Sequence, residues 1–244
     1  MAESMKTQEC TMGAIYEGMA DEYINRQHPA DREYLDRSEL EELFRLPVDN
    51  ETVLDVGCGV GRVGIALKDR GVKYIGVDLS EAMLQAGRKL AGNAHLFICA
   101  SARNLPFAAR RFRFVTCIGL YEYVEDLATY LNEVRRVMQA GGDFIFTAHT
   151  ELGALRYNRL GSYHRAGWSE QALRAVLAES CFSVRTIRPA IGPLRRWRSI
   201  IGRITADPTV QKHVARLIAD ADLALCRSFP PCANEFVVAC RATG

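Results

Sequence analysis

The stretch from Val53 to Leu67 reads VLDVGCGVGRVGIAL, and it decides the fold. It begins as a short apolar run, continues with glycine at every second position (Gly57, Gly59 and Gly61), and ends in a pattern typical of a helix. Glycine tolerates positive φ and lets the backbone approach a ligand closely. The free N–H groups at the start of a helix favour anionic or polar ligands. An apolar strand, a glycine turn and a helix start together predict a nucleotide-binding loop.

The spacing of the glycines separates two classes of nucleotide-binding loop. The dinucleotide fingerprint G-x-G-x-x-G would require glycine at position 62, where this chain has Arg62. The observed pattern is D-x-G-x-G-x-G, with Asp55 two residues before the first glycine. A second acidic residue, Asp78, ends the apolar run KYIGVD, where a carboxylate can accept hydrogen bonds from ribose hydroxyls. Ser80 is the better N-cap for the helix that follows, which leaves Asp78 for a ligand.

These motifs resemble those of the class I S-adenosylmethionine-dependent methyltransferases of the small-molecule type. The resemblance covers about residues 11–188 and 235–240, and it includes GVDLSEAML around Asp78 and the segment Leu105-Pro106-Phe107. It implies transfer of a methyl group from S-adenosylmethionine to an O or N nucleophile of a small molecule, with release of S-adenosylhomocysteine. The cofactor-binding residues that it implies are Asp55, Gly57, Cys58, Gly59, Asp78, Leu79, Met83, Ser101, Ala102, Ile118 and Tyr16.

One implied residue departs from the family pattern. The family usually has an acidic residue a few positions before L-P-F, and that residue contacts the adenine amino group. The matching position here is Ser101, followed by Ala102. A serine hydroxyl still accepts a hydrogen bond, but a carboxylate is the stronger acceptor.

A general base is needed only if the acceptor loses a proton, because a sulfonium is already an activated methyl donor. His149, just past the fifth expected strand, is the candidate base, because histidine titrates near neutral pH. Tyr121 and Glu122, just past the fourth expected strand, are alternatives. A purely structural role for His149 remains open, and no metal site is predicted.

The resemblance implies an α/β, Rossmann-like, seven-stranded, mostly parallel sheet with helices on both faces and an antiparallel last strand. Apolar runs place the strands at about 52–56, 73–78, 95–99, 113–117, 143–148, 181–188 and 235–240. We predict a single domain, 1–244, with an N-terminal helical cap (11–46), a cofactor-binding core (52–148) and a C-terminal substrate half (149–244). Tyr16 and Tyr23 of the cap are expected to cover the methionine end of the ligand, a second helix is expected over 32–46, and residues 149–168 are expected to form a loop.

A helical insert is expected at about 190–232, where the family has a short hairpin. Its first helix is predicted from Trp197, Ile200, Ile201 and Ile204, with Arg195, Arg196, Arg198 and Arg203 around them. Its second helix begins at Asp207-Pro208, and its predicted apolar face is Val210, Val214, Leu217, Ala221 and Leu225. Three interpretations stay open: a lid over the sheet edge, a solvated hairpin, and a basic helix that contacts a membrane surface or a partner. The arginines predict an acceptor that carries a carboxylate or phosphate.

Composition limits the other possibilities. A net charge of +2 argues against nucleic acid as the main partner, and the chain lacks the D/N-P-P-Y tetrapeptide of methyltransferases that act on exocyclic amines. No apolar run is long enough to span a bilayer, and the N-terminus has no signal core, so we expect a cytoplasmic protein. Eight cysteines without a C-x-x-C pair indicate reduced thiols. A cofactor-binding regulatory protein without catalysis remains an alternative, an NAD(P)-dependent oxidoreductase is disfavoured by Arg62, and the oligomeric state is not predicted.

Overall fold

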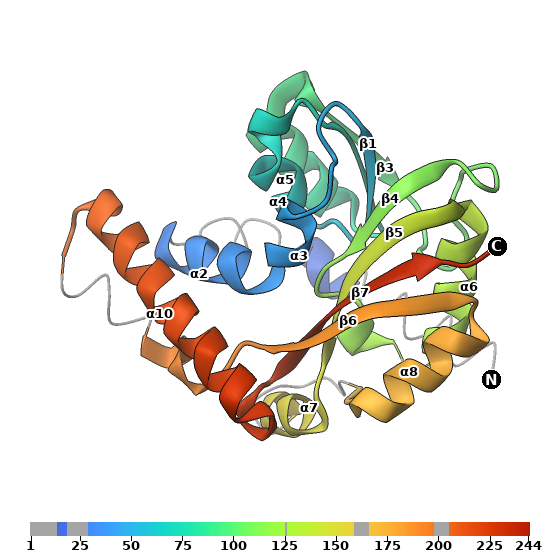
Figure 1. The fold of residues 1–244 in the computed structure, drawn as a ribbon. Coiled ribbons are helices and arrows are strands. Elements are labelled where there is room, and N and C mark those ends of the chain that lie inside the picture. The colour runs from blue at the N-terminus through green and yellow to red at the C-terminus, as the bar shows by residue number, and fades with distance from the viewer. Residues whose placement is uncertain (1–13, 19–28, 125, 159–165, 198–204) are drawn as a thin grey trace.

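A computed structural model describes residues 14–18, 29–124, 126–158, 166–197 and 205–244. Within these ranges one mixed sheet runs in the strand order β3-β2-β1-β4-β5-β7-β6 (Figure 1). Its strands are β1 (Thr52–Val56), β2 (Lys73–Asp78), β3 (His95–Cys99), β4 (Phe112–Cys117), β5 (Met138–His149), β6 (Phe182–Ala190) and β7 (Glu235–Ala242). Strands β1 to β5 pair in parallel, whereas β7 is antiparallel to both β5 and β6. The predicted fold class is confirmed.

Two helical regions and one strand differ from prediction. The helices are α2 (Pro29–Glu39), α3 (Glu41–Phe44), α4 (Arg62–Ala66), α5 (Glu81–Ala91), α6 (Leu127–Val137), α7 (Glu151–Asn158), α8 (Glu170–Glu179) and α10 (Pro208–Ser228). The single helix expected over 32–46 breaks at Leu40 into α2 and α3, and α7 occupies part of the expected loop 149–168. Strand β5 begins at Met138, earlier than expected, because Gly141 adopts a φ of 74° and lets the chain continue through an irregular register beside β4.

Two hydrophobic layers hold the helices to the sheet. On one face, Leu131 of α6 and Leu173 of α8 pack with Phe144 of β5. On the other face, Tyr34 of α2 and Leu223 of α10 belong to a second cluster, so helices cover both sides of the sheet (Figure 1). Burying each such side chain contributes about 1.5–3 kcal/mol.

The buried face of α10 is not the one predicted from its large apolar residues. Leu217 is 57% exposed and Val210 is 44% exposed, while Ala215 and Ala219 are fully buried. Small side chains let α10 lie close along α2, where Ala30 packs against Ala215. The face of α10 that packs is therefore determined by how closely the backbones of α10 and α2 can approach, rather than by side-chain size. The predicted first helix of the insert falls largely on residues 198–204, which lie outside the described part of the chain.

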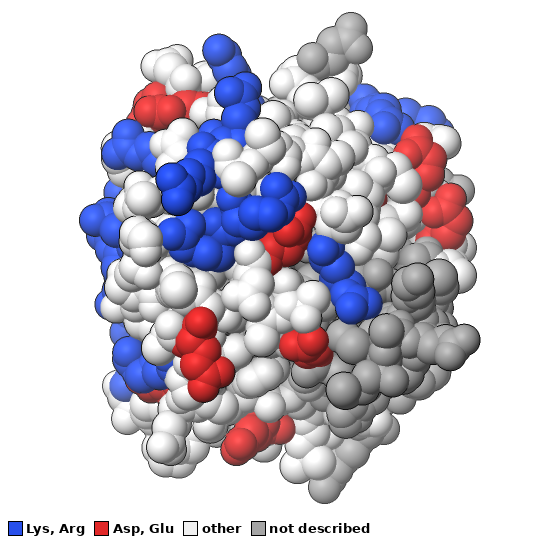
Figure 2. Space-filling model, turned by 90° about the vertical axis from the view of Figure 1, so that its right-hand side faces the viewer, with Lys and Arg blue, Asp and Glu red and all other residues white. Residues whose placement is uncertain are grey.

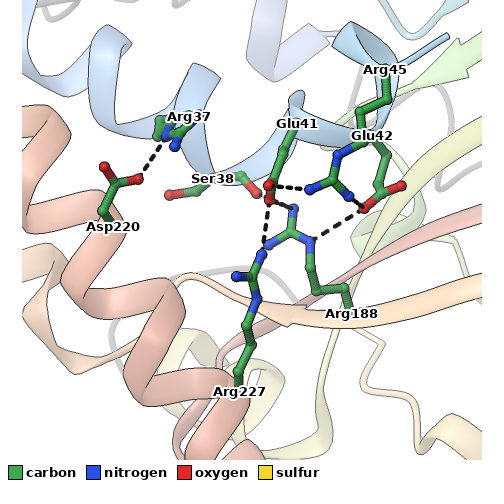
Figure 3. Close-up of polar contacts among 8 residues, drawn as sticks. All are labelled: Arg37, Ser38, Glu41, Glu42, Arg45, Arg188, Asp220 and Arg227. Carbon is green, nitrogen blue, oxygen red and sulfur yellow. Dashed lines mark hydrogen bonds and ion pairs between the residues drawn. The ribbon is translucent and has the colours of Figure 1, made fainter.

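A buried ionic junction ties the N-terminal helices to the C-terminal half (Figure 3). Arg188 of β6 donates a hydrogen bond from Nη2 to the carbonyl oxygen of Ser38 at 2.8 Å and lies 3.6 Å from the carboxylate of Glu41. Its Nε is 3.8 Å from Glu42, and Arg227 of α10 reaches Glu41 at 3.2 Å. Breaking a buried ion pair typically costs about 3–5 kcal/mol, so this junction fixes α2 and α3 against β6 and α10.

Charge is distributed unevenly over the surface. Figure 2 shows Lys and Arg side chains gathered in a band on the face that lies at the right of Figure 1. Among the arginines of the strands, Arg185 of β6 and Arg241 of β7 both contact Asp143, at 2.8 Å and 3.1 Å. Across the described residues, no helix combines the length and the apolar character needed to cross a membrane.

Candidate active site

A pocket of about 290 Å³ opens at the carboxyl edge of the parallel strands, where open α/β sheets bind ligands. Of the predicted cofactor-binding residues, those that line it are Tyr16, Asp55, Gly57, Cys58, Gly59, Asp78, Leu79, Met83, Ala102 and Ile118. Its other lining residues include Glu39, Arg62, Arg195 and Glu235, which come from four separate parts of the chain. One half of the pocket is thus formed by the sequence motifs. The other half is formed by segments that lie far apart in the sequence.

The glycine loop after β1 can follow its path only without side chains. Gly57 has a φ of 71°, and a Cβ placed on it would lie 2.9 Å from the Cβ of Leu120. Gly61 has a φ of 77°, and its Cβ would lie 2.8 Å from the ring of Phe97. Gly59 has a φ of 52° and borders Met83 of α5. The loop therefore exposes bare backbone to the pocket, which is the property that close approach to a nucleoside requires.

Asp55, at the carboxyl end of β1, is buried beneath this loop. It accepts hydrogen bonds from the hydroxyl of Tyr74 at 2.6 Å and from Oγ1 of Thr116 at 2.8 Å. Burial raises the pKa of the Asp55 carboxyl to about 6, against the opposing effect of these two donors. Its side chain is thus fixed in direction and faces the pocket as a hydrogen-bonding group.

Asp78, at the end of β2, is held by two backbone donors. The N–H of Gly59 donates to Oδ2 at 2.8 Å, and the N–H of Ser80 donates to Oδ1 at 2.9 Å. Burial raises the pKa of Asp78, and the two N–H groups oppose that rise. Each oxygen keeps a further lone pair for a ligand hydroxyl. Ser80 caps α5 as predicted, with Oγ accepting from the N–H of Met83 at 3.2 Å.

The helical residues 14–18 close one side of the pocket. The Tyr16 hydroxyl donates to the Tyr123 hydroxyl at 3.0 Å, and the ring of Tyr16 packs against Met83. Glu17 accepts hydrogen bonds from Oγ of Ser80 at 2.8 Å and from the N–H of Ala82 at 3.2 Å. The N-terminal cap therefore lies against the start of α5, next to Asp78. The second predicted cap residue, Tyr23, lies outside the described residues.

Two predicted site residues do not line the pocket. The Ser101 hydroxyl accepts a hydrogen bond from the N–H of Arg103 at 3.1 Å, in a local turn, and only its neighbours Ala100 and Ala102 border the pocket. Tyr121 is fully buried against Phe146, with ring centroids 5.1 Å apart, and burial raises the pKa of its phenol. Neither side chain borders the pocket, and the roles assigned to them from sequence stay predictions. The side chain of Glu122 lies outside the described part of the structure.

Part of the pocket is lined by residues of a buried ionic cluster. Arg62 donates from Nη1 to Oδ1 of Asp36 at 2.9 Å and from Nη2 to Oε2 of Glu39. Glu39 is 6% exposed, and burial raises its pKa to about 7 although the Arg62 charge opposes the rise. Arg62 thus occupies the position of the missing third glycine and joins the loop to α2. The side chain of Arg195 also lines the pocket.

His149 lies next to Glu235 at the edge of the pocket. The two residues are cross-strand partners on β5 and β7, and Nε2 of His149 lies 3.5 Å from Oε1 of Glu235. Glu235 lines the pocket and His149 does not. Burial alone would raise the pKa of Glu235, but the hydrogen bond from His149 and nearby cationic charges, including Arg195, lower it.

Sequence reasoning missed Glu235 and Glu39. A signal for Glu235 was present, because an antiparallel last strand must begin at the edge where the parallel strands end. The sequence does not give the register of this strand against β5. It therefore could not show that residues 235 and 149 are cross-strand partners. The sequence pattern predicts the helix that carries Glu39 but does not predict where that helix lies relative to the sheet.

Comparison with known proteins agrees with this geometry. The model of the methyltransferase domain family matches residues 54–146. The ubiquinone biosynthesis O-methyltransferase of Coxiella burnetii is 30% identical over 122 residues, 48% of this chain and 52% of that protein. An uncharacterized methyltransferase of Mycobacterium leprae is 33% identical over 131 residues, 53% of this chain and 49% of that protein. The chain spans about half the length of the curated relatives it matches.

Among solved structures, the fold resembles that of the protein bound to the Trm112 methyltransferase activator in a complex from Haloferax volcanii. The TM-score is 0.67 at 21% identity, and the match covers 94% of this chain and 98% of that one. The glycine loop with its two aspartates, the strand order and the matched domain agree with one another. Residues 54–146 match the methyltransferase domain family, in keeping with the resemblance of the sequence motifs to the class I S-adenosylmethionine-dependent methyltransferases.

Proposed function

We propose that this chain binds S-adenosylmethionine in the pocket and transfers its methyl group to a hydroxyl or amine of a small molecule. The observation that carries the proposal is the bare glycine loop beside Asp78, a carboxylate fixed in position and open to the same pocket. The family match and the methyltransferase names of the relatives support it. An oxidoreductase is disfavoured, because Arg62 is held by Asp36 and Glu39 where a dinucleotide loop needs glycine.

The residues present fit this cofactor. Asp78 would accept hydrogen bonds from the ribose hydroxyls, and Leu79, Ala102 and Met83 would flank the base. Tyr16, held by Tyr123, would cover the ligand and exclude water. When bound, the sulfonium supplies an activated methyl group. The chain's own contribution is to hold the two reactants in line and to keep water out. Holding the reactants close together can by itself lower the activation free energy by several kcal/mol.

The acceptor is proposed to carry an anionic group, because Arg195 lines the pocket. Charge reversal by Arg195→Glu should raise the KM for such an acceptor at least about tenfold, as for loss of a charge-assisted hydrogen bond, with the affinity for S-adenosylhomocysteine unchanged. An unchanged KM would remove the anionic group from the proposal. The side chain of the second arginine considered from sequence, Arg196, lies outside the described residues.

Transfer of label tests the activity itself. The full chain is incubated with S-adenosylmethionine labelled in the methyl group and with pools of phenols, alcohols and amines, each with and without a carboxylate. Label recovered in a small molecule, and absent with Gly57→Val as the matched control, supports the proposal. Binding of the cofactor without transfer to any pool would favour the regulatory, non-catalytic alternative.

A further inference from the structure

The pocket has a direction along the edge of the sheet. Asp78 and Ala102 follow β2 and β3, the glycine loop follows β1, and Ile118 follows β4. Strands β5 and β7 come next in the sheet, and Glu235 begins β7. If the nucleoside lies against β2 and β3, the reacting end of the ligand points towards β4, and the next side of the pocket is β7. Glu235 is therefore on the acceptor side.

The two carboxylates at this end differ in their surroundings. Glu39 accepts a hydrogen bond from Arg62, which also holds Asp36, so it is tied to the glycine loop. Glu235 is 6% exposed and lines the pocket. Nε2 of His149, on the neighbouring strand, lies 3.5 Å from its Oε1. Arg195 is close enough to influence both. A buried carboxylate that is held by a neighbouring side chain and also faces the pocket is suited to accept a proton from a ligand.

We propose that Glu235 is the residue that contacts the acceptor's nucleophilic group, and that His149 is the positioning residue that holds Glu235. This inference rests on the proposed methyl transfer. The acceptor's oxygen or nitrogen forms a bond to the methyl carbon, and the carbon–sulfur bond breaks with its electron pair left on sulfur. The acceptor's proton passes to the Glu235 carboxylate and from there to water. The acceptor is then a hydrogen-bond donor, a hydroxyl or an amine, and not a carbon nucleophile.

A ligand that needs no knowledge of the acceptor can test this position. Sinefungin is the cofactor analogue in which a carbon bearing an ammonium group replaces the methyl-bearing sulfur, so its charge marks the direction of the transferred methyl. Calorimetric titration compares sinefungin with S-adenosylhomocysteine in the wild type, Glu235→Gln, Glu39→Gln and His149→Asn. Thermal midpoints of the variants check that each one is folded.

We expect the wild type to bind sinefungin at least tenfold more tightly than S-adenosylhomocysteine, and Glu235→Gln to bind the two within about twofold of each other. Glu39→Gln should keep the preference. His149→Asn should keep it only at higher pH, because Glu235 loses a partner that favours its ionised form.

Three results would overturn the inference: no preference in the wild type, a preference that survives Glu235→Gln, or a preference lost in Glu39→Gln instead. If neither ligand binds to the wild type, the proposed function itself is wrong. That outcome is distinct from the other three, each of which leaves cofactor binding intact.

Discussion

The two halves of the pocket are built in different ways. The cofactor half is local: Asp55, the glycine loop and Asp78 lie within one β-α-β unit and are hydrogen-bonded to one another's backbone or to its strands. The acceptor half joins Glu39, Arg195 and Glu235, which lie almost 200 residues apart at their extremes. The first half depends on backbone shape, whereas the second depends on tertiary packing. The halves should therefore respond differently to substitution.

The largest expected effect lies in the acceptor half, at Asp222 of α10. This buried carboxylate accepts hydrogen bonds from the Tyr34 hydroxyl and from the N–H groups of Gly192 and Leu194, at 2.8 Å and 3.0 Å, and so fixes the turn that carries Arg195. Asp222→Ala leaves three donors, two of them buried, without this acceptor and should lower the free energy of unfolding by about 3–5 kcal/mol. Urea denaturation measures the change.

The same variant tests whether the halves are separable. S-adenosylhomocysteine should bind to folded Asp222→Ala with wild-type affinity, because none of the broken hydrogen bonds belongs to the glycine loop. Asp222→Asn, which keeps one acceptor oxygen, should lose less stability. A large loss of cofactor affinity in either variant would show that the two halves are coupled.

Gly57→Ala should disable the cofactor half. A positive φ costs a non-glycine residue about 1–2 kcal/mol, and the added Cβ would also lie 2.9 Å from Leu120. We expect affinity for S-adenosylhomocysteine to fall more than about tenfold, equivalent to about 1.4 kcal/mol. Gly92→Ala is the matched control, because Gly92 also has a positive φ, of 59°, but a Cβ there meets nothing within 4 Å. Equal loss of affinity in both variants would show that the effect is not specific to the glycine loop.

Asp78→Ala removes a single charged acceptor from the cofactor half. The affinity for S-adenosylhomocysteine should weaken by about 1.5–3 kcal/mol, as for a hydrogen bond to a charged group. Calorimetry measures the change, with Asp49→Ala, an exposed aspartate paired with Arg70 outside the pocket, as the control. Unchanged affinity would mean that the ribose binds elsewhere.

Asp55 gives the cofactor half a pH dependence. Burial raises its pKa from the usual 3.8 to about 6, so between those values the folded protein keeps a proton that the unfolded chain releases. The stability that this proton contributes is fully present below about pH 4 and is lost as pH rises through about 6. Relative to Asp55→Asn, the wild type should lose about 2–3 kcal/mol between about pH 4 and pH 7. Denaturation curves at a series of pH values measure this difference, and a flat difference would contradict the assignment.

The smallest expected effect is at the N-terminal cap. Glu17→Gln weakens the contact of residues 14–18 with Ser80 and Ala82. Because one hydrogen bond contributes about 1 kcal/mol net, affinity for S-adenosylhomocysteine should fall less than about fivefold. A larger loss would make the cap part of the cofactor site rather than a cover over it.

The comparison also explains what could be predicted from the sequence. Asp55, the glycines and Asp78 were readable because a β-turn-α unit fixes them relative to one another over a short stretch. Glu235 was not, because its place depends on the register of β7 against β5. The buried face of α10 was predicted wrongly because Ala215 and Ala219 allow close packing that a count of large apolar residues does not register.

Two predicted site residues lie beside residues that border the pocket. Ser101 was predicted from its match to a family motif and Tyr121 from its place just past the fourth strand, and a difference of one or two residues along the chain decides which side chain borders the pocket. Ala102 faces it in place of Ser101, and Tyr123 in place of Tyr121. The segments predicted from the motifs border the pocket, and the local backbone conformation determines which of their residues do so.

Titration of the wild-type chain with S-adenosylhomocysteine, with NAD⁺ in parallel, tests the central claim most directly. We expect micromolar binding of S-adenosylhomocysteine, equivalent to about 8 kcal/mol, and no heat of binding from NAD⁺. Binding of NAD⁺ instead, or of neither ligand, would contradict the assignment of the glycine loop and Asp78 to the S-adenosyl group.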